Sequence, residues 1–277
     1  MSTATSTATN TAPDTARKPA TSTPVGKVLT LAMTETRLLM RNRTVAVSSV
    51  FIPLLMGAFF AYSFTQGEGR GAPPVLFAMV VASQLAIVIG MTVYVTATQT
   101  VVARRQNRVL KRMRTSGISD VGLLVATIAP CVVIGLAQLL LFVPFNAFVG
   151  VPVPPDPLAL VLAVLGGFAL TVTAALATTV VTTTPERAQI TTLPLVFVVL
   201  GAAIAVVVVP AGGWWQVLVA VPGAAIGELA QYGIVGGGWD AGAAGLPALV
   251  PALVALVAWP VVFAVLAARS FRWDPRT

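Results

Sequence analysis

The sequence contains no histidine and only one cysteine, Cys131, which lies inside an apolar run. The missing histidine removes the commonest metal ligand and the side chain that usually carries protons near neutral pH. A single cysteine excludes an internal disulfide. Charged residues make up only 9% of the chain, whereas soluble domains carry roughly 25%. So few charges cannot cover the surface of a water-soluble protein of 277 residues.

The chain also lacks the motifs of ATP hydrolysis and ion coupling. No segment has the pattern GxxxxGK[ST], whose backbone amides cradle the phosphates of a nucleotide. The apolar runs carry no Asp, Glu, Lys or Arg in their centres, where ion-coupled transporters place such groups. Carboxylate clusters suited to a membrane-embedded hydrolase are absent too. We therefore expect no enzyme, and no catalytic, cofactor-binding or metal site. Any transport is expected to draw its energy from a partner.

Hydrophobic residues, by contrast, account for 57% of the chain. They form runs long enough to cross the hydrocarbon core of a bilayer, which takes about 20 residues. This pattern predicts an all-α integral membrane protein. Prolines inside the runs are compatible with it, because neighbouring groups in a membrane bundle satisfy the freed backbone. We expect a transmembrane domain over residues 44–272 with six spans, at about residues 44–64, 74–102, 121–149, 157–181, 190–209 and 246–268.

The distribution of positive charge predicts the orientation of these spans. Sixteen of the 17 Lys and Arg residues fall before span one, between spans two and three, after span four, or after span six. Only Arg70 falls in a loop on the opposite side. Cytoplasmic loops carry such an excess of cations. Both termini are therefore expected to be cytoplasmic, and the net charge of +8 is explained without a nucleic-acid partner.

Three segments outside the spans have their own patterns. Residues 1–26, rich in Thr, Ala, Ser and Pro, are expected to form a disordered cytoplasmic tail. Residues 27–43 predict an amphipathic helix lying on the cytoplasmic leaflet. Residues 210–245 form a glycine-rich exterior loop whose apolar centre, Trp214–Ala230, is too short to span. We predict re-entrant or interfacial helices there, with the two tryptophans at headgroup level; a plain disordered loop is the alternative.

The loop after span two reads VVARRQNRVLKRMRTSGISD and predicts a short basic amphipathic helix. At about 100° per residue, most of its cations gather on one side, and Val109, Leu110 and Met113 lie on the other. Gly117 is placed to end the helix. Such a helix either binds anionic lipid headgroups or docks on a partner protein. The candidate docking residues of this loop are Arg104, Arg105, Arg108, Lys111, Arg112 and Arg114.

The amphipathic helix expected at residues 27–43 contains one residue that breaks its pattern. Glu35 projects from the apolar face, whereas Arg37 belongs to the polar face. An unpaired carboxylate on an apolar face is unfavourable. Glu35 is therefore expected either to pair with a cation of the 104–114 helix or to reach the lipid headgroups. Glu35 and Arg37 are both candidate coupling residues.

Polar but uncharged residues lie within spans two and three, and aromatic residues lie near the end of span one. They are candidates for a path that a hydrophobic or amphipathic molecule follows. The alternative is that the polar residues join helices through hydrogen bonds, a common role in membrane bundles. The candidate path residues are Gln84, Thr92, Thr96, Gln138, Asn146, Phe59 and Phe60.

The order of these parts resembles that of the permease subunits of type-2 ABC exporters, the group of the daunorubicin-resistance and the lipid or polysaccharide exporters. The resemblance covers about residues 26–272. It is most specific in RVLKRMRTSGISD, residues 108–120, which is similar to the family's Leu-Lys-Arg-Leu-Arg segment followed by a turn of small residues. Pro185–Gln189 sits where the family has a short cytoplasmic turn. The chain departs from the family at Ala103–Arg105, where Glu-Arg-Glu is frequent and where this chain is more basic.

The resemblance implies a half-transporter that pairs with a second copy or a homologous chain and binds a separate ATPase subunit. ATP and Mg²⁺ would be held by that partner. The basic loop and the N-terminal helix would be the coupling elements, and a drug, antibiotic or lipid would be released outward. The composition, rich in Ala and Val and poor in Lys, suggests a bacterial cytoplasmic membrane. The alternatives are a non-transporting membrane scaffold and a secondary transporter, and the missing midplane charge disfavours the latter.

Overall fold

The computed structural model describes residues 47–66, 71–107, 119–209, 213–242 and 245–270, together with five isolated positions: Gly26, Thr30, Met33, Thr34 and Arg37. The predicted tail, most of the predicted amphipathic helix, and residues 108–118 of the basic loop lie outside the described residues. The described part is helical, and its one β-type pairing is an isolated bridge between Ala241 and Pro247. The prediction of an all-helical fold is confirmed for this part of the chain.

Five helices are long and apolar enough to cross a membrane. The first is a continuous rod of 33 residues, Pro74–Gln106. It consists of α4 (Pro74–Ile87), the π-helical segment η3 (Val88–Val95) and α5 (Thr96–Gln106). The other four are α7 (Asp120–Val149), α8 (Pro157–Thr178), α9 (Pro185–Val208) and α11 (Val250–Ser270).

The first apolar run forms a shorter helix in the described residues. The π-helical segment η1 (Val47–Phe51) leads directly into α3 (Ile52–Thr65). Its apolar part, Ser49–Thr65, is shorter than the five candidate spans. A sixth span therefore stays a prediction, whereas the other five helices have the length and composition that crossing a membrane requires.

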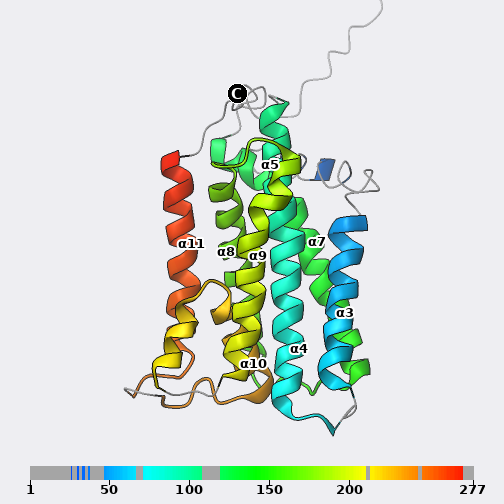
Figure 1. The fold of residues 1–277 in the computed structure, drawn as a ribbon, viewed down its shortest axis with the longest axis vertical. Coiled ribbons are helices and arrows are strands. Elements are labelled where there is room, and N and C mark those ends of the chain that lie inside the picture. The colour runs from blue at the N-terminus through cyan, green and yellow to red at the C-terminus, as the bar shows by residue number, and fades with distance from the viewer. Residues whose placement is uncertain are drawn as a thin grey trace, which may run out of the picture.

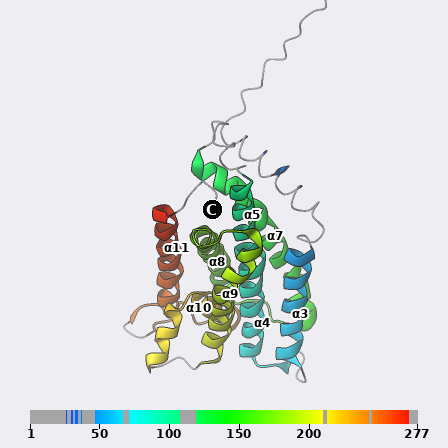
Figure 2. The same ribbon diagram turned by 45° about the horizontal axis from the view of Figure 1, so that its top comes forward.

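The axes of the long helices are roughly parallel, and the helices pack side by side as a bundle (Figure 1). The rod α4–α5 lies at the centre and is the most buried of the five, and α11 is the most exposed. Helix α3 packs mainly on α4, and α11 mainly on α8. Turning the bundle brings forward the end at which α5 and α11 finish and α9 starts (Figure 2). That end carries the start of the basic loop.

Local capping signals decide where two of the helices begin. Asp156 caps α8 by accepting a hydrogen bond from the Ala159 amide at 3.2 Å. Thr184 caps α9 in the same way through the Arg187 amide, and a proline occupies the first helical position. Pro185–Gln189 was expected to form a turn, but it is the start of α9. The capped proline extends the helix upstream of the apolar run that begins at about residue 190.

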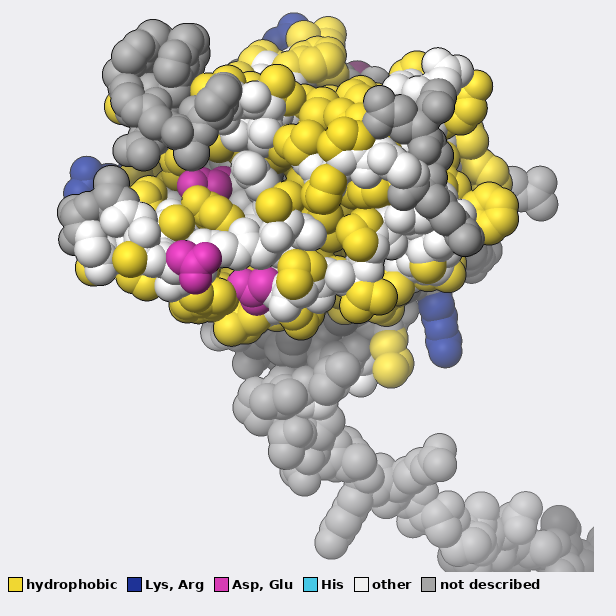
Figure 3. Space-filling view, turned by 90° about the horizontal axis from the view of Figure 1, so that it is seen from below, with side chains coloured by type: hydrophobic (Ala, Val, Ile, Leu, Met, Phe, Trp, Pro, Cys, Tyr) yellow, Lys and Arg dark blue, Asp and Glu magenta, His cyan; other side chains and the backbone are white. Residues whose placement is uncertain are grey.

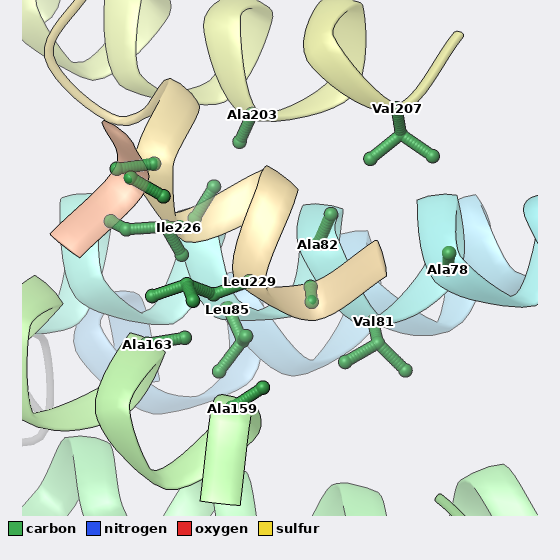
Figure 4. Packing of buried hydrophobic residues seen from close by; sticks show 14 of the residues in the cluster. Ala78, Val81, Ala82, Leu85, Ala159, Ala163, Ala203, Val207, Ile226 and Leu229 are labelled. Carbon is green, nitrogen blue, oxygen red and sulfur yellow. The ribbon is translucent and has the colours of Figure 1, made fainter. Parts of the chain in front are cut away.

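The core is built largely from alanine, valine and leucine contributed by α4, α8, α9 and α10 (Figure 4). Ala78 and Ala82 of α4, Ala159 and Ala163 of α8, and Ala203 of α9 are buried in this cluster. Small side chains allow the backbones of membrane helices to approach one another closely. A short helix, α10 (Ala224–Val235), contributes Ala225, Ile226, Leu229 and Ala230 to the same cluster.

The 210–245 segment contains two short helices, η5 (Gly213–Ala220) and α10. The turn between them includes Gly223 with φ +94°, a left-handed conformation that glycine adopts without strain. Helix α10 packs on α4, α8, α9 and α11, and thus fills the bundle at the end opposite to the basic loop. The plain-loop alternative is therefore wrong for the described residues of this segment.

Candidate functional site

A belt of hydrogen bonds crosses the middle of the bundle between η1, η3 and α7. The Gln138 amide of α7 donates to the carbonyl oxygens of Ser49 at 2.9 Å and Val50 at 3.2 Å. The Thr92 hydroxyl of η3 shares its proton between Gln138 Oε1 at 2.6 Å and the Ser49 carbonyl at 2.9 Å. Thr92 and Gln138 are both buried, with 1% of each exposed.

The belt joins two places where the helical hydrogen-bond pattern is irregular. Both η1 and η3 are π-helical, and such segments occur frequently at functional sites. The side chains of Thr92 and Gln138 reach backbone carbonyls of η1 that lie inside the bundle. A polar side chain at this depth is stabilised only when it is hydrogen-bonded. The contacts therefore fix α7 and η3 against the start of α3.

Gln84 and Asn146 form a second polar link, between α4 and α7. Their amides bond reciprocally, with Gln84 Nε2 donating to Asn146 Oδ1 at 2.9 Å and Asn146 Nδ2 donating to Gln84 Oε1 at 2.8 Å. Gln84 is buried and Asn146 is half-buried. Four of the predicted path residues are thus paired with one another across helices, which is the helix-joining arrangement. Their role as a substrate path stays a prediction.

The remaining path candidates lie apart from these links. Thr96 is buried at the start of α5. Phe59, with 63% exposed, lies on the outside of α3, and its ring meets Phe60 edge-on at a centroid distance of 5.9 Å. Phe60 also contacts the ring of Phe64. The structure therefore does not bring the aromatic candidates together with Thr92 and Gln138 as one lining.

The described coupling candidates differ sharply in their surroundings. Arg37 is exposed, and Arg104 is half-buried at the end of α5. Arg105 is fully buried, with 1% exposed, so the structure places it inside the bundle instead of on the polar face expected for the basic helix. The five other candidates, Glu35, Arg108, Lys111, Arg112 and Arg114, lie outside the described residues.

The Arg105 side chain reaches the carboxyl end of α8. Its Nη1 donates to the Thr179 carbonyl at 2.8 Å, and its Nη2 donates to the Thr182 carbonyl. Thr179 is the C-cap residue of α8, and Thr182 follows in the turn to α9. The last carbonyls of a helix lack partners within the helix and carry the negative end of its dipole. The guanidinium thus satisfies the C-cap carbonyl of α8 and, at the same time, one carbonyl of the turn that follows.

At the opposite end of the bundle, Asp156 connects the start of α8 to the segment around α10. Its Oδ2 accepts a hydrogen bond from Trp239 Nε1 at 2.6 Å, and its backbone amide donates to the Gly233 carbonyl at 3.3 Å. Seen from this end, the surface is mostly apolar, with acidic side chains set among the hydrophobic ones (Figure 3). Among the described residues, this end carries acidic side chains and no lysine or arginine.

Comparison with known proteins identifies the family of the chain. A model of the ABC-2 family transporter protein matches residues 71–269. This range contains α10 and all five candidate spans except the last residue of α11. The chain belongs to the ABC-2 transporter family. None of the curated proteins and none of the solved structures compared with this ABC-2 protein matches it.

Membership establishes the general role of this ABC-2 protein. It is a multi-pass membrane permease of an ABC transporter, and the family implies partnership with an ABC ATPase subunit. Subunits of this family are typically non-catalytic. The family thus favours the permease interpretation over the membrane scaffold and the secondary transporter. The daunorubicin-resistance group within it stays a prediction.

Sequence reasoning missed several residues of the ABC-2 permease that the structure brings together. The Tyr94 hydroxyl of η3 lies 2.8 Å from the Thr178 hydroxyl of α8, and the hydroxyls of Thr182 and Thr191 lie 2.9 Å apart. One signal was visible in the sequence, because seven of the 15 residues from 178 to 192 are threonines. Threonines so dense between two apolar runs mark a junction in which hydroxyls bond backbone and one another.

Glu228 is another residue whose surroundings the sequence did not predict, because it falls in the predicted exterior loop 210–245. It lies on α10, where its Oε1 accepts a hydrogen bond from the Tyr232 hydroxyl at 3.3 Å. Its Oε2 is buried and has no hydrogen-bond partner among the described residues. Burial raises the pKa of Glu228 to about 7, and the Tyr232 hydrogen bond opposes this shift only in part. The surroundings therefore favour the neutral carboxyl.

The raised pKa of Glu228 predicts a pH-dependent stability. Below the ordinary pKa of 4.5, the Glu228 carboxyl is protonated in both the folded and the unfolded chain. Between pH 4.5 and about 7, the carboxyl loses its proton in the unfolded chain but keeps it in the folded chain. The stability contributed at low pH is thus lost as the pH rises. At pH 8 we expect Glu228→Gln to raise the melting temperature in detergent by on the order of 3 °C, and at pH 4 to leave it unchanged.

The control for this measurement is Asp240→Asn, which removes an exposed carboxylate at the same end of the bundle. Melting temperatures of the wild type and both variants are compared between pH 4 and pH 8. A gain for Glu228→Gln that is equal at both ends of this range would contradict the prediction, because the gain must follow ionisation of the carboxyl.

Proposed function

We propose that the chain is the membrane half of a bacterial exporter that moves a hydrophobic or amphipathic molecule, such as a drug, antibiotic or lipid, out of the cell. Two permease copies, or this chain and a homologous one, would form the pathway, and separate ATPase subunits would supply the energy. The family match carries this proposal, together with the absence of the P-loop motif from the sequence. A permease without this motif relies on a partner for ATP hydrolysis.

The charge at the two ends of the bundle supports an orientation with cytoplasmic termini. Arginines occupy the end of α5, the first turn of α9 and the end of α11, all at the upper end in Figure 1. The lower end carries Asp156 and Asp240. Because Lys and Arg accumulate on the cytoplasmic side, the upper end is assigned to the cytoplasm. The exterior end then consists of α10 and the loops around it.

The depth of α10 supports a re-entrant segment at the exterior end. Gly223 lies against the backbone of Val199, and Gly227 against the backbone of Ala203, so α10 runs alongside α9 in the same direction. Val199 is nine residues before the end of α9 at Val208, which corresponds to about 13 Å at 1.5 Å per residue. The chain thus returns into the bundle after α9 and emerges again along α10.

The middle of the bundle supports a substrate without a required charge. The polar groups at this depth, among them Thr92, Gln138 and Gln84, are uncharged amides and hydroxyls. Charged substrates are usually met by charged side chains at the membrane centre, because an unpaired charge there is strongly unfavourable. The uncharged side chains that α4, η3 and α7 contribute at this depth therefore favour an apolar or amphipathic molecule.

Co-purification tests the proposed function. The permease is extracted from native membranes in mild detergent, and the proteins bound to it are identified. We expect a separate P-loop ATPase to accompany it. We further expect this ATPase to be lost when Arg108, Lys111 and Arg112 are all changed to Glu, because reversing the charge of the basic loop opposes docking.

The matched control changes Arg269, Arg272 and Arg276 to Glu, which reverses the same number of charges at the C-terminal end. This control is expected to keep the ATPase bound. Equal loss from both triple variants would show a general charge effect and remove the docking assignment. If no ATPase accompanies the intact permease, the proposal of an ATP-driven exporter is wrong for this chain.

A further inference from the structure

Arg105 is the only charged residue among the buried polar side chains of the described part of the chain. It lies next to the last residue of α5, where the basic loop begins. Arg104, its neighbour, is half-buried at the same helix end. The two adjacent arginines therefore occupy different environments, and a single role as docking cations does not account for both.

Two partners of Arg105 are backbone groups of a different helical junction. These two hydrogen bonds end on carbonyl oxygens, of Thr179 and Thr182, and both threonines are completely buried. The planar guanidinium holds two acceptors in a fixed relative geometry, which a lysine ammonium does not. Arg105 thus holds the turn between α8 and α9 in one shape and ties it to the end of α5.

The same turn is connected onward to other helices. The Thr182 hydroxyl lies 2.9 Å from the Thr191 hydroxyl of α9. The Thr178 hydroxyl, one residue before the C-cap of α8, lies 2.8 Å from the Tyr94 hydroxyl of η3. Hydrogen bonds therefore link the end of α5, the α8–α9 turn, α9 and η3 at one junction.

We propose that Arg105 is a positioning residue that makes the start of the basic loop and the α8–α9 turn move as one unit. In this role Arg105 conveys movement of the loop into the bundle and does not itself contact the ATPase. The inference rests on the proposed function, because it assumes that an ATPase acts on the basic loop. It separates residues that bind the partner from a residue that transmits the effect of binding.

Stability alone is a weak reason to bury this charge. Replacing a buried ionic group with an apolar side chain of similar size is often neutral or stabilising, because desolvating the charge is costly. Leucine would fill part of the same volume without that desolvation. A buried arginine that joins two cytoplasmic junctions is better explained by a requirement that they keep a fixed relation during movement.

A first experiment tests, in the permease alone, whether Arg105 holds the end of α5 and the α8–α9 turn at a fixed distance. Nitroxide labels are placed at Gln106 and Val181, both exposed, in a variant in which the single native cysteine is replaced, Cys131→Ser. Dipolar EPR then reports the distance between the end of α5 and the α8–α9 turn. We expect one narrow distance with Arg105 present and a broadened distribution in Arg105→Leu. Thr179→Val keeps the carbonyl acceptor and is expected to keep the narrow distance.

A second experiment tests transmission in the complex with the co-purified ATPase, in lipid nanodiscs. In Arg105→Leu we expect the ATPase to remain bound but its turnover to match that of the isolated ATPase, so that the influence of the permease is lost. Arg105→Lys keeps the positive charge but not the planar guanidinium with its two donors. We expect this variant to retain part of the permease's influence on ATPase turnover. Arg269→Gln removes an exposed cation from the same end and is expected to behave as wild type.

The outcomes separate this inference from the proposed function. Retained binding with lost influence on turnover supports it, because a folding defect would remove both together. Loss of ATPase binding in Arg105→Leu, with the narrow label distance unchanged, would overturn it and return Arg105 to the docking residues. An unchanged label distance and unchanged turnover would also overturn it. If the intact permease binds no ATPase, the proposed function is wrong, and the role of Arg105 in transmission is wrong with it. The EPR distances still decide whether Arg105 fixes the α8–α9 turn to the end of α5.

Discussion

Gly227→Ala is expected to remove most of the correctly folded protein. A Cβ atom at residue 227 would lie 2.0 Å from the Ala203 carbonyl oxygen and 2.7 Å from the Ala203 Cα. These are backbone atoms of α9, so no side-chain rotation relieves the overlap. Overpacking of side chains in a core costs typically 1–3 kcal/mol, and we expect at least about 3 kcal/mol here because two helix backbones must separate.

The measurement is the yield of monodisperse protein on size-exclusion chromatography after detergent extraction, followed by its melting temperature. Gly201→Ala is the matched control. It makes the same substitution on α9, at a position where an added Cβ meets nothing within 4 Å. Because alanine favours a helix over glycine, this variant is expected to be unchanged or slightly stabilised, by about 0.5–1 kcal/mol. Similar losses in the two variants would contradict the close packing of α10 on α9.

The contrast between these two glycines shows what the sequence can and cannot predict. Hydropathy predicts that the 210–245 segment contains an apolar stretch too short to span, and the structure contains two short helices there. The position of α10 against α9 depends on contacts between residues such as 203 and 227, which are far apart in the chain. In sequence, Gly201 and Gly227 look alike; only the fold makes one of them irreplaceable.

The helix boundaries show the same division. The apolar runs locate five long helices because each run is about as long as the bilayer is thick. Hydropathy alone predicts that span five begins at about residue 190, because the preceding segment Pro185–Gln189 is polar and is assigned to a turn. The structure begins α9 at Pro185 because a proline follows a capping threonine, Thr184. Capping signals deserve equal weight with hydropathy wherever a membrane helix extends into water.

The burial of Arg105 could not be predicted from the pattern of residues in the basic loop. A helical wheel groups it with the other cations of the basic loop, because it considers only residues of one helix. Its burial depends on carbonyls 74 and 77 residues further along the chain. No periodicity within the loop carries that information. Likewise, the sequence marks Thr92 and Gln138 as polar residues within apolar runs, but it does not predict that they bond each other.

Gln138→Leu is expected to destabilise the bundle by about 2 kcal/mol. Leucine fills a similar volume, but it removes the donor to the Ser49 and Val50 carbonyls and the acceptor for the Thr92 hydroxyl. These groups lie within the protein, where water does not readily replace the lost partner. Each interhelical hydrogen bond in a membrane contributes only about 0.6 kcal/mol on average, so the size of the effect reflects the loss of three contacts together.

Gln189→Leu, the same substitution at an exposed position of α9, is the control for Gln138→Leu. Melting temperatures are compared for both variants, for Thr92→Val, and for the double variant Thr92→Val/Gln138→Leu. Because Thr92 and Gln138 share one hydrogen bond, the double variant is expected to lose less stability than the sum of the single losses. Additive losses would show that the two side chains act independently. If Gln138→Leu instead folds as well as Gln189→Leu but changes which molecule is transported, the helix-joining role is wrong and Gln138 belongs to the substrate path.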